Sequence, residues 1–148
     1  QAQVEKEIAV VELGAAGGHS LTDHATNYGL NFAAEVTPIE NWLELEAGVT
    51  PLFARTSHEV DADFLFKKPW TVSRSFEFML GAGPEWVRTT RQNITTNALA
   101  GEGVLDLMFW PKGGHRYGWY LEPSYDYSFA AGHEKSIGIT GGFLIAIR

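Results

Sequence analysis

The 148-residue chain contains no cysteine, which excludes disulfide bonds, thiol catalysis and thiolate metal sites. No stretch approaches the ~20 consecutive apolar residues of a membrane-spanning helix, so a helical membrane protein is excluded, whereas strands that cross a membrane are not. Basic residues are scarce: Lys and Arg number 11 against 18 Asp and Glu, and the formal net charge is −7. Because no basic surface is available to neutralise phosphates, a nucleic-acid partner is not expected.

The residues that are abundant favour strands and tight turns. The chain has 16 Gly, and aromatic residues make up 13% of it. Its length suits one domain with a real core. We therefore expect a single domain over residues 1–148, with residues 1–7 as an N-terminal segment. The start Gln-Ala-Gln lacks an initiator Met, which indicates an exported protein after signal-peptide removal or a chain trimmed at that point.

Eight segments place large apolar residues at every second position, which is the period of a β-strand. They are residues 8–18, 27–37, 43–53, 60–67, 75–86, 99–109, 118–129 and 136–147. We expect residues 67–73 to form a turn and residues 88–97 a polar loop. Closing eight strands in sequence order removes exposed edges, so the pattern predicts an all-β, eight-stranded antiparallel up-and-down barrel. The strand prolines Pro51, Pro84 and Pro123 should each mark a bulge.

The direction of the aromatic face decides between two kinds of barrel. In a soluble, lipocalin-like carrier located in the periplasm, the aromatic residues would line a cavity for an apolar ligand. In a transmembrane barrel they would face lipid around a polar lumen. Volume favours the second, because the interior of an eight-stranded barrel is just wide enough for side chains to fill it. The opposite face carries small residues such as Gly14, Gly48 and Gly142, which suit a narrow interior. We predict a transmembrane β-barrel with a polar, acidic lumen.

The predicted lumen is rich in carboxylates. Of the acidic residues, these take the inward parity: Glu12, Glu35, Glu44, Glu46, Asp61, Asp63, Glu77, Glu85, Glu102, Asp106, Glu122 and Asp126. Only Lys67, and Arg148 at the very end, clearly share that face. Buried carboxylates without partners are costly, so these groups have to be wet, protonated or bound to cations.

Aromatic residues near the two ends of the barrel are typical of the two membrane–water interfaces. Trp70 and Trp119 fall beside the short turns. The others fall toward the polar loops: Tyr28, Trp86, Tyr127 and Phe129. Membrane lipids are therefore the expected partners of the outer face.

Four histidines gather in the predicted polar loops: His19, His24, His58 and His133. They are weak candidates for a surface metal site that would bind zinc, copper or haem iron. The simpler interpretation is that they are ordinary solvated loop residues. The chain has no Gly-rich phosphate loop, HExxH motif or nucleophile elbow, so no cofactor and no catalysis are expected.

The architecture resembles the small eight-stranded outer-membrane β-barrels typified by the transmembrane domain of outer membrane protein A and its compact relatives. The most specific stretch is TGGFLIAI at 140–147, which resembles the signal by which the outer-membrane assembly machinery recognises a final strand. The matching residues are Thr140, Gly142, Ile145 and Ile147. Such bacterial chains typically end on an aromatic residue, whereas this one ends on Arg148.

This resemblance implies an exported, porin-like protein of the Gram-negative outer membrane with a structural or interaction role. One branch of the family consists of lipid-modifying enzymes, lipid A deacylases, whose catalytic His and Ser are two residues apart on a late strand. Here His133 and Ser136 are three apart, a spacing that sends two strand side chains to opposite faces. We therefore do not expect the enzyme.

Overall fold

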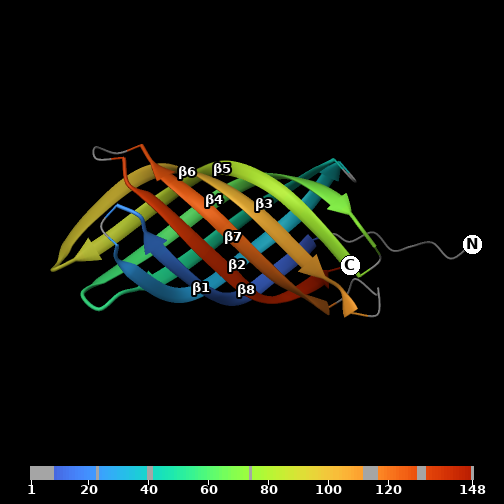
Figure 1. The fold of residues 1–148 in the computed structure, drawn as a ribbon, viewed down its shortest axis with the longest axis horizontal. Coiled ribbons are helices and arrows are strands. Elements are labelled where there is room, and N and C mark those ends of the chain that lie inside the picture. The colour runs from blue at the N-terminus through green and yellow to red at the C-terminus, as the bar shows by residue number, and fades with distance from the viewer. Residues whose placement is uncertain are drawn as a thin grey trace, which may run out of the picture.

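The computed structural model describes residues 9–22, 24–39, 42–73, 75–111, 117–129 and 133–147. Its strands are β1 (Ala9–Ser20), β2 (Thr26–Ile39), β3 (Leu43–Phe53), β4 (Ser57–Thr71), β5 (Phe76–Arg91), β6 (Ile94–Phe109), β7 (Tyr117–Ser128) and β8 (Lys135–Ile147). Each strand pairs antiparallel with the next, and β8 pairs with β1 to close the barrel (Figure 1). The predicted eight-stranded up-and-down barrel is confirmed. The predicted N-terminal segment 1–7 and Arg148 lie outside the described residues.

None of the described residues forms a helix of the length and hydropathy needed to span a membrane.

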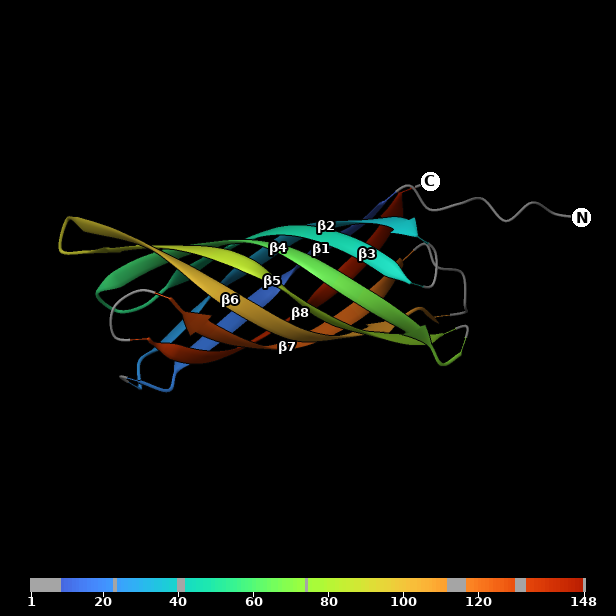
Figure 2. The same cartoon turned by 90° about the horizontal axis from the view of Figure 1, so that it is seen from above.

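The barrel has two distinct ends (Figure 2). Strand β1 begins and β8 ends at the same end of the barrel, where the connections are residues 40–42, 72–75 and 110–116; we call this the turn end. The connections 21–25, 54–56, 92–93 and 129–134 lie at the other end, the loop end. There the hairpin of β5 and β6 projects beyond its neighbours (Figures 1 and 2).

The alternation predicted from the sequence sets the two faces of the sheet. On β7, Trp119 and Leu121 are exposed on the outer face, whereas Tyr120 and Glu122 are buried in the lumen. The same holds on β4, where Phe66 is exposed and Lys67 is buried. The large aromatic side chains therefore lie outside the barrel. The soluble-carrier alternative is wrong in this respect, because it needs an apolar lumen and the observed lumen is lined largely by polar side chains.

Strands β4, β5 and β6 extend beyond their predicted boundaries. Residues 88–97 do not form a loop, because β5 and β6 stay paired up to Arg91 and Ile94. The connecting residues Gln92 and Asn93 have φ values of 50° and 65°, as in the two-residue type I′ turns that match strand twist. Similarly, β4 continues through the predicted turn 67–73 to Thr71, since its pairing with β5 outweighs the weak strand propensity of Lys and Pro.

The strand prolines do not cause the predicted bulges. Each proline keeps its place in the ladder toward one neighbouring strand: Pro51 pairs with Val60 and Pro123 with Ile139. Toward the other strand, the pairs beside the proline are missing, and the ladder resumes in the same register. At Pro51, Pro84 and Pro123 the missing N–H is thus accommodated by a local gap in pairing, whereas the β2–β3 ladder shifts register between Val36 and Ile39, the stretch that contains Pro38.

Candidate functional site

The lumen is built in layers, and the layer nearest the turn end is apolar. Its buried residues are Val10, Met79, Met108, Trp110, Tyr120, Leu144 and Ala146. Trp110 is 1% exposed, and its Nε1 donates a hydrogen bond to Glu77 Oε1 at 3.2 Å. The tightly packed side chains leave the turn end of the lumen filled, as expected for a barrel of eight strands.

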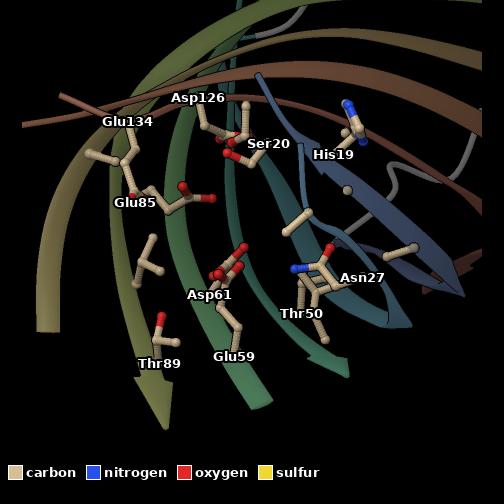
Figure 3. A pocket seen from close by; sticks show the side chains of 18 of the residues that line it. His19, Ser20, Asn27, Thr50, Glu59, Asp61, Glu85, Thr89, Asp126 and Glu134 are labelled. Carbon is tan, nitrogen blue, oxygen red and sulfur yellow. The ribbon is translucent and has the colours of Figure 1, made fainter. Parts of the chain in front are cut away.

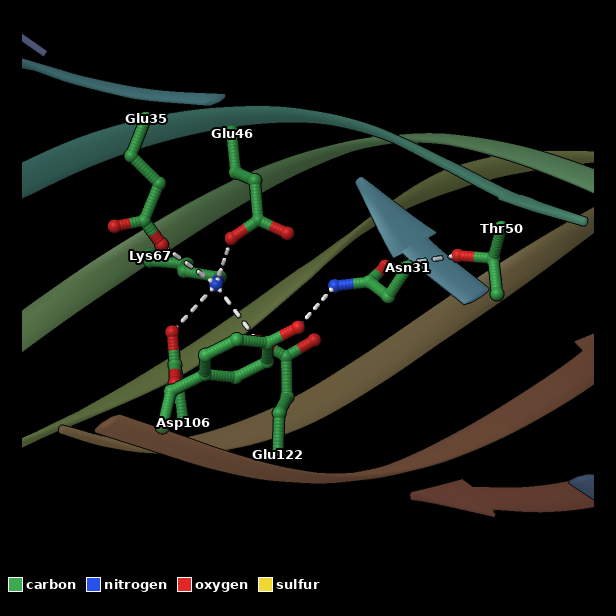
Figure 4. A network of polar contacts seen from close by, with 8 residues as sticks. Asn31, Glu35, Glu46, Thr50, Lys67, Asp106 and Glu122 are labelled. Carbon is green, nitrogen blue, oxygen red and sulfur yellow. Dashed lines mark hydrogen bonds and ion pairs between the residues drawn. The ribbon is translucent and has the colours of Figure 1, made fainter. Parts of the chain in front are cut away.

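The next layer is centred on the ammonium group of Lys67, which β4 directs into the lumen. Its Nζ donates to Glu35 Oε1 at 2.9 Å, to Asp106 Oδ2 at 2.8 Å and to Glu122 Oε2 at 2.9 Å (Figure 4). It also forms an ion pair with Glu46 Oε2. These acids come from β2, β3, β6 and β7, so one side chain ties together strands on opposite sides of the barrel.

Negative charge exceeds positive charge in this layer. Glu12 is fully buried, and one of its carboxylate oxygens lies within 4.8 Å of one oxygen each of Glu46, Asp106 and Glu122. Neither Glu12 oxygen has a hydrogen-bond partner. We call the group the Lys67 cluster: Lys67, Glu12, Glu35, Glu46, Asp106 and Glu122. An ammonium group has three N–H donors, so it cannot satisfy this number of carboxylates.

A neutral hydrogen-bond chain continues toward the loop end (Figure 4). Thr50 Oγ1 donates to Asn31 Oδ1 at 2.9 Å, and Asn31 Nδ2 donates to the Tyr120 hydroxyl at 2.8 Å. Gly14 leaves room for this tyrosine, because a Cβ there would lie 2.5 Å from the hydroxyl oxygen. Asn31 and Thr50 border the open part of the lumen, as does Glu122 of the Lys67 cluster.

A second acidic layer lies beyond it, across strands β4 to β7. Asp63 and Glu85 face each other directly in the β4–β5 ladder, and Glu102 and Asp126 do so in the β6–β7 ladder. We call these four residues the loop-end carboxylates. They line a cavity of 590 Å³ on the loop-end side of the lumen (Figure 3). Within the described residues, no Lys or Arg forms an ion pair with them.

All of the carboxylates predicted for the lumen lie on strands, and none is exposed. The structure divides them between the Lys67 cluster, the loop-end carboxylates, the cavity wall at Asp61, and positions nearer the turn end at Glu44 and Glu77. Sequence reasoning missed Glu59, which also lines the cavity, because the predicted strand began at residue 60 whereas β4 begins at Ser57. It also missed the chain through Asn31 and Thr50, although both residues have the inward parity.

The predicted interface aromatics mostly point outward. Tyr28, Trp86 and Phe129 are exposed toward the loop end, and Trp70 and Trp119 toward the turn end. Tyr127, also at the loop end, is only partly exposed and stacks on His133. Near the turn end, Trp70 stacks on Phe78 at 5.3 Å between ring centroids, and Lys68 Nζ lies 5.2 Å from the Trp70 ring. Aromatic rings and a lysine side by side suit a surface where apolar and polar surroundings meet.

The four predicted histidines do not assemble into a metal site. His19 and His24 lie near each other, with ring centroids 6.0 Å apart, but His58 packs against Phe53 and His133 against Tyr127. Among the described residues, the groups spaced to hold a cation contain carboxylates only. Ser136 faces the lumen opposite Asp126, whereas the His133 ring lies on the Tyr127 side chain, so these two do not form a His–Ser pair.

Comparison with known proteins finds likeness in structure but not in sequence. No protein-family profile and no curated protein sequence matches the chain. The fold is similar to Neisserial surface protein A, with a TM-score of 0.76, 11% identity, and coverage of 93% of this chain and 96% of that one. It is also similar to the N-terminal β-barrel domain of OprF from Pseudomonas aeruginosa, with a TM-score of 0.66, 14% identity, and coverage of 94% and 98%.

A third similar structure is Ail, the attachment invasion locus protein of Yersinia pestis, solved in complex with the heparin analogue sucrose octasulfate. Its TM-score is 0.57 at 13% identity, with coverage of 93% of this chain and 97% of that one. All three are small eight-stranded outer-membrane β-barrels, so the resemblance recognised in the sequence is confirmed. At these identities the likeness establishes the fold and leaves function to the site itself.

Proposed function

We propose that this protein is a bacterial outer-membrane barrel with a structural or interaction role and no catalytic activity. The observation that carries the proposal is the outer surface: a band of exposed apolar and aromatic side chains that surrounds a charged lumen. Soluble monomers rarely expose contiguous apolar patches beyond a few hundred Å². A bilayer covers such a band, and the closed ladder leaves no strand edge unpaired in lipid.

The barrel serves as a scaffold and does not conduct ions freely. The apolar layer and the Lys67 cluster both contain side chains that are almost completely inaccessible, among them Leu144 and Lys67. Because these buried side chains fill the middle and the turn end of the lumen, they support a barrel that is closed to ions. Contact with partners is then left to the loop end, where the β5–β6 hairpin projects (Figure 2).

Insertion into the membrane would use the outer-membrane assembly machinery. In support, Thr140, Gly142, Ile145 and Ile147 all lie on β8, the last strand, which closes the barrel against β1. The last two alternate with the buried Leu144 and Ala146, so they belong to the outer face. Export and this assembly route form part of the same proposal.

Membrane fractionation of the expressing bacterium tests the location. The chain is expected in the outer-membrane fraction, extractable only with detergent, and with a faster gel migration before heating than after. The control is a soluble periplasmic protein followed in the same fractions. Recovery of the chain entirely in the soluble periplasmic fraction would refute the proposal.

Phe66→Arg tests which surface meets lipid. Phe66 is 51% exposed and lies four residues before Trp70 on β4, which places it well inside an apolar band about 25 Å tall. An arginine there should lower the free energy of unfolding in lipid vesicles by about 2–4 kcal/mol. Urea unfolding followed by tryptophan fluorescence measures this loss.

The matched control is Val72→Arg, at an exposed position beyond Trp70 at the turn end. There the cost should be about 0–1 kcal/mol, because the penalty for a charge falls toward the interface. Equal costs at the two positions would contradict a bilayer that covers Phe66.

A further inference from the structure

We propose that the loop-end carboxylates form a binding site for a calcium ion inside the barrel. The inference concerns the lumen and does not depend on the membrane location proposed above. It begins with spacing: carboxylate oxygens of Asp63, Glu85 and Glu102 all lie within 4.8 Å of one another. Ca²⁺ holds oxygen ligands at about 2.3–2.6 Å, so two ligands on opposite sides of one ion are about 5 Å apart.

The second observation is an unsatisfied, buried oxygen that points into this group. Glu102 is only 9% exposed, and its Oε1 has no hydrogen-bond partner. Asp63 Oδ1 and Asp126 Oδ1 are also inaccessible and without partners. Buried polar atoms in native proteins are normally satisfied, and an exception calls for a water or an ion that completes it.

The ladder geometry makes a cation still more favourable. Asp63 lies directly opposite Glu85, and Glu102 directly opposite Asp126. Like charges directly opposite each other destabilise a sheet. One divalent ion between the two pairs would turn both repulsions into attractions. Asp126 on β7 lies beside the three acids that meet the cation spacing, directly opposite Glu102, and adds negative charge there.

Local packing holds at least one ligand in place. A Cβ on Gly48, the β3 residue paired with Asp63, would lie 2.7 Å from Asp63 Oδ1. The carboxylate of Asp63 therefore rests over the glycine, and a larger residue there would displace it. Holding a ligand before the ion arrives reduces the entropy lost on binding.

The choice of ion follows from the donors and from access. The donors are carboxylate oxygens without histidine, which suits calcium, magnesium or manganese rather than zinc or copper. Mg²⁺ demands a near-ideal octahedron and dehydrates reluctantly, whereas Ca²⁺ accepts a flexible set of oxygen ligands, so acids held on separate strands favour calcium. The cavity next to the site extends to Gln92 and Glu134 in the loop-end connections, so an ion can approach from that end (Figure 3).

The Lys67 cluster does not offer an equivalent site. Glu12 and its neighbours also meet the spacing for a cation, but the Lys67 ammonium already occupies their centre. Their side chains are also almost completely buried. The site is therefore assigned to the loop-end carboxylates alone.

Titration of the full chain, folded in detergent micelles and freed of metal with EDTA, tests the proposal. Calorimetry with CaCl₂ should give saturable binding with one ion per chain, and calcium should raise the melting temperature. Terbium, a luminescent substitute for calcium, should be sensitised by tryptophan excitation and displaced by calcium. Magnesium and spermidine at the same concentration should displace it much less.

Glu102→Gln and Glu85→Gln preserve side-chain shape and should each weaken calcium binding about tenfold or more, because affinity depends on ligand charge. Glu77→Gln, a lumen carboxylate near the turn end, is the matched control and should bind like the native chain. Heat-dependent gel migration verifies that each variant is folded, and Asp63→Asn replaces any variant that is not. Absence of saturable binding, unchanged affinity in the folded cluster variants, or equal displacement by spermidine would overturn the proposal.

Discussion

The two acidic layers of the lumen are built alike but are neutralised differently. Each brings carboxylates from several strands to one level of the barrel, and each contains a directly opposed acidic pair, Glu35 with Glu46 and Asp63 with Glu85. The Lys67 cluster contains its own cation and is almost completely buried. The loop-end carboxylates have no cationic partner among the described residues and border an open cavity.

The difference depends on single positions of one strand. Asp63 and Lys67 lie on the same face of β4, with Leu65 between them. The first adds negative charge to the loop-end layer, and the second places an ammonium within reach of four carboxylates. A buried acidic layer thus becomes structural when the chain supplies the cation, and becomes a potential ion site when solvent has to supply it.

Lys67→Met should have the largest effect on stability, because it removes the only cation of the Lys67 cluster. Its partners would be left buried with no positive charge, and loss of one partner from a buried ion pair costs about 3–5 kcal/mol. We expect the free energy of unfolding to fall by at least that amount, measured by urea unfolding in lipid vesicles. Methionine fills a similar volume, so the loss would reflect charge rather than a cavity.

The neighbouring residue provides the control for this variant. Lys68 is exposed on the outer face, where its ammonium lies over the Trp70 ring. Lys68→Met should cost only about 0.5–1 kcal/mol, the value of an exposed cation–π contact. If both lysine variants lost the same amount, the Lys67 cluster would not stabilise the barrel as described.

Glu12→Gln probes the excess of negative charge in the same layer. Glu12 has no hydrogen-bond partner for either oxygen. A glutamine of the same shape removes a buried charge and brings N–H donors close to neighbouring carboxylates, such as that of Asp106. The free energy of unfolding should rise by about 1 kcal/mol, the net value of one added hydrogen bond. Glu122→Gln is the comparison, since it weakens an ion pair to Lys67 and should lower stability. A clear loss of stability in Glu12→Gln would show that Glu12 has a cationic partner.

The fold could be predicted from the sequence because its main determinant is local. Side-chain direction alternates with a period of two along a strand. The residues on each face of a strand can therefore be assigned from that segment alone. The narrow interior of an eight-stranded barrel then predicts that the face with large side chains is outside. Phe66 lies on the outer face and Lys67 in the lumen, as predicted. The turn at Gln92 and Asn93 was missed because polar residues around it suggested a loop, although Asn tolerates positive φ.

The composition of the two layers could not be predicted, because it depends on contacts across the barrel. Parity placed Glu35, Asp106 and Lys67 inside, but not at one level. That level is set by the stagger of successive strands, and an error of one residue in any ladder would have moved a partner away. For the same reason, it could not be predicted from the sequence which lumen carboxylates would pair with Lys67 and which would lack a cation.

Val87→Lys places a cation in the loop-end layer and so tests whether a lysine can neutralise its acids as Lys67 does in the Lys67 cluster. Val87 lines the cavity on β5 and lies directly opposite Asp61 on β4. A lysine there is on the same face as Glu85, two residues away, so its ammonium can reach both carboxylates. Without calcium, the variant should be more stable than the native chain by about 0.2–1 kcal/mol, the range for an opposite-charge pair across a ladder.

The calcium response separates this effect from a change in packing. In Val87→Lys the ammonium competes with a divalent ion for the same oxygens, so the rise in melting temperature with calcium should shrink. Val87→Met adds similar bulk without charge and should keep the full response. A lysine variant that gains no stability in EDTA would mean that solvent already neutralises the loop-end carboxylates. In that case the two layers differ in their exposure to water and not in their need for a cation.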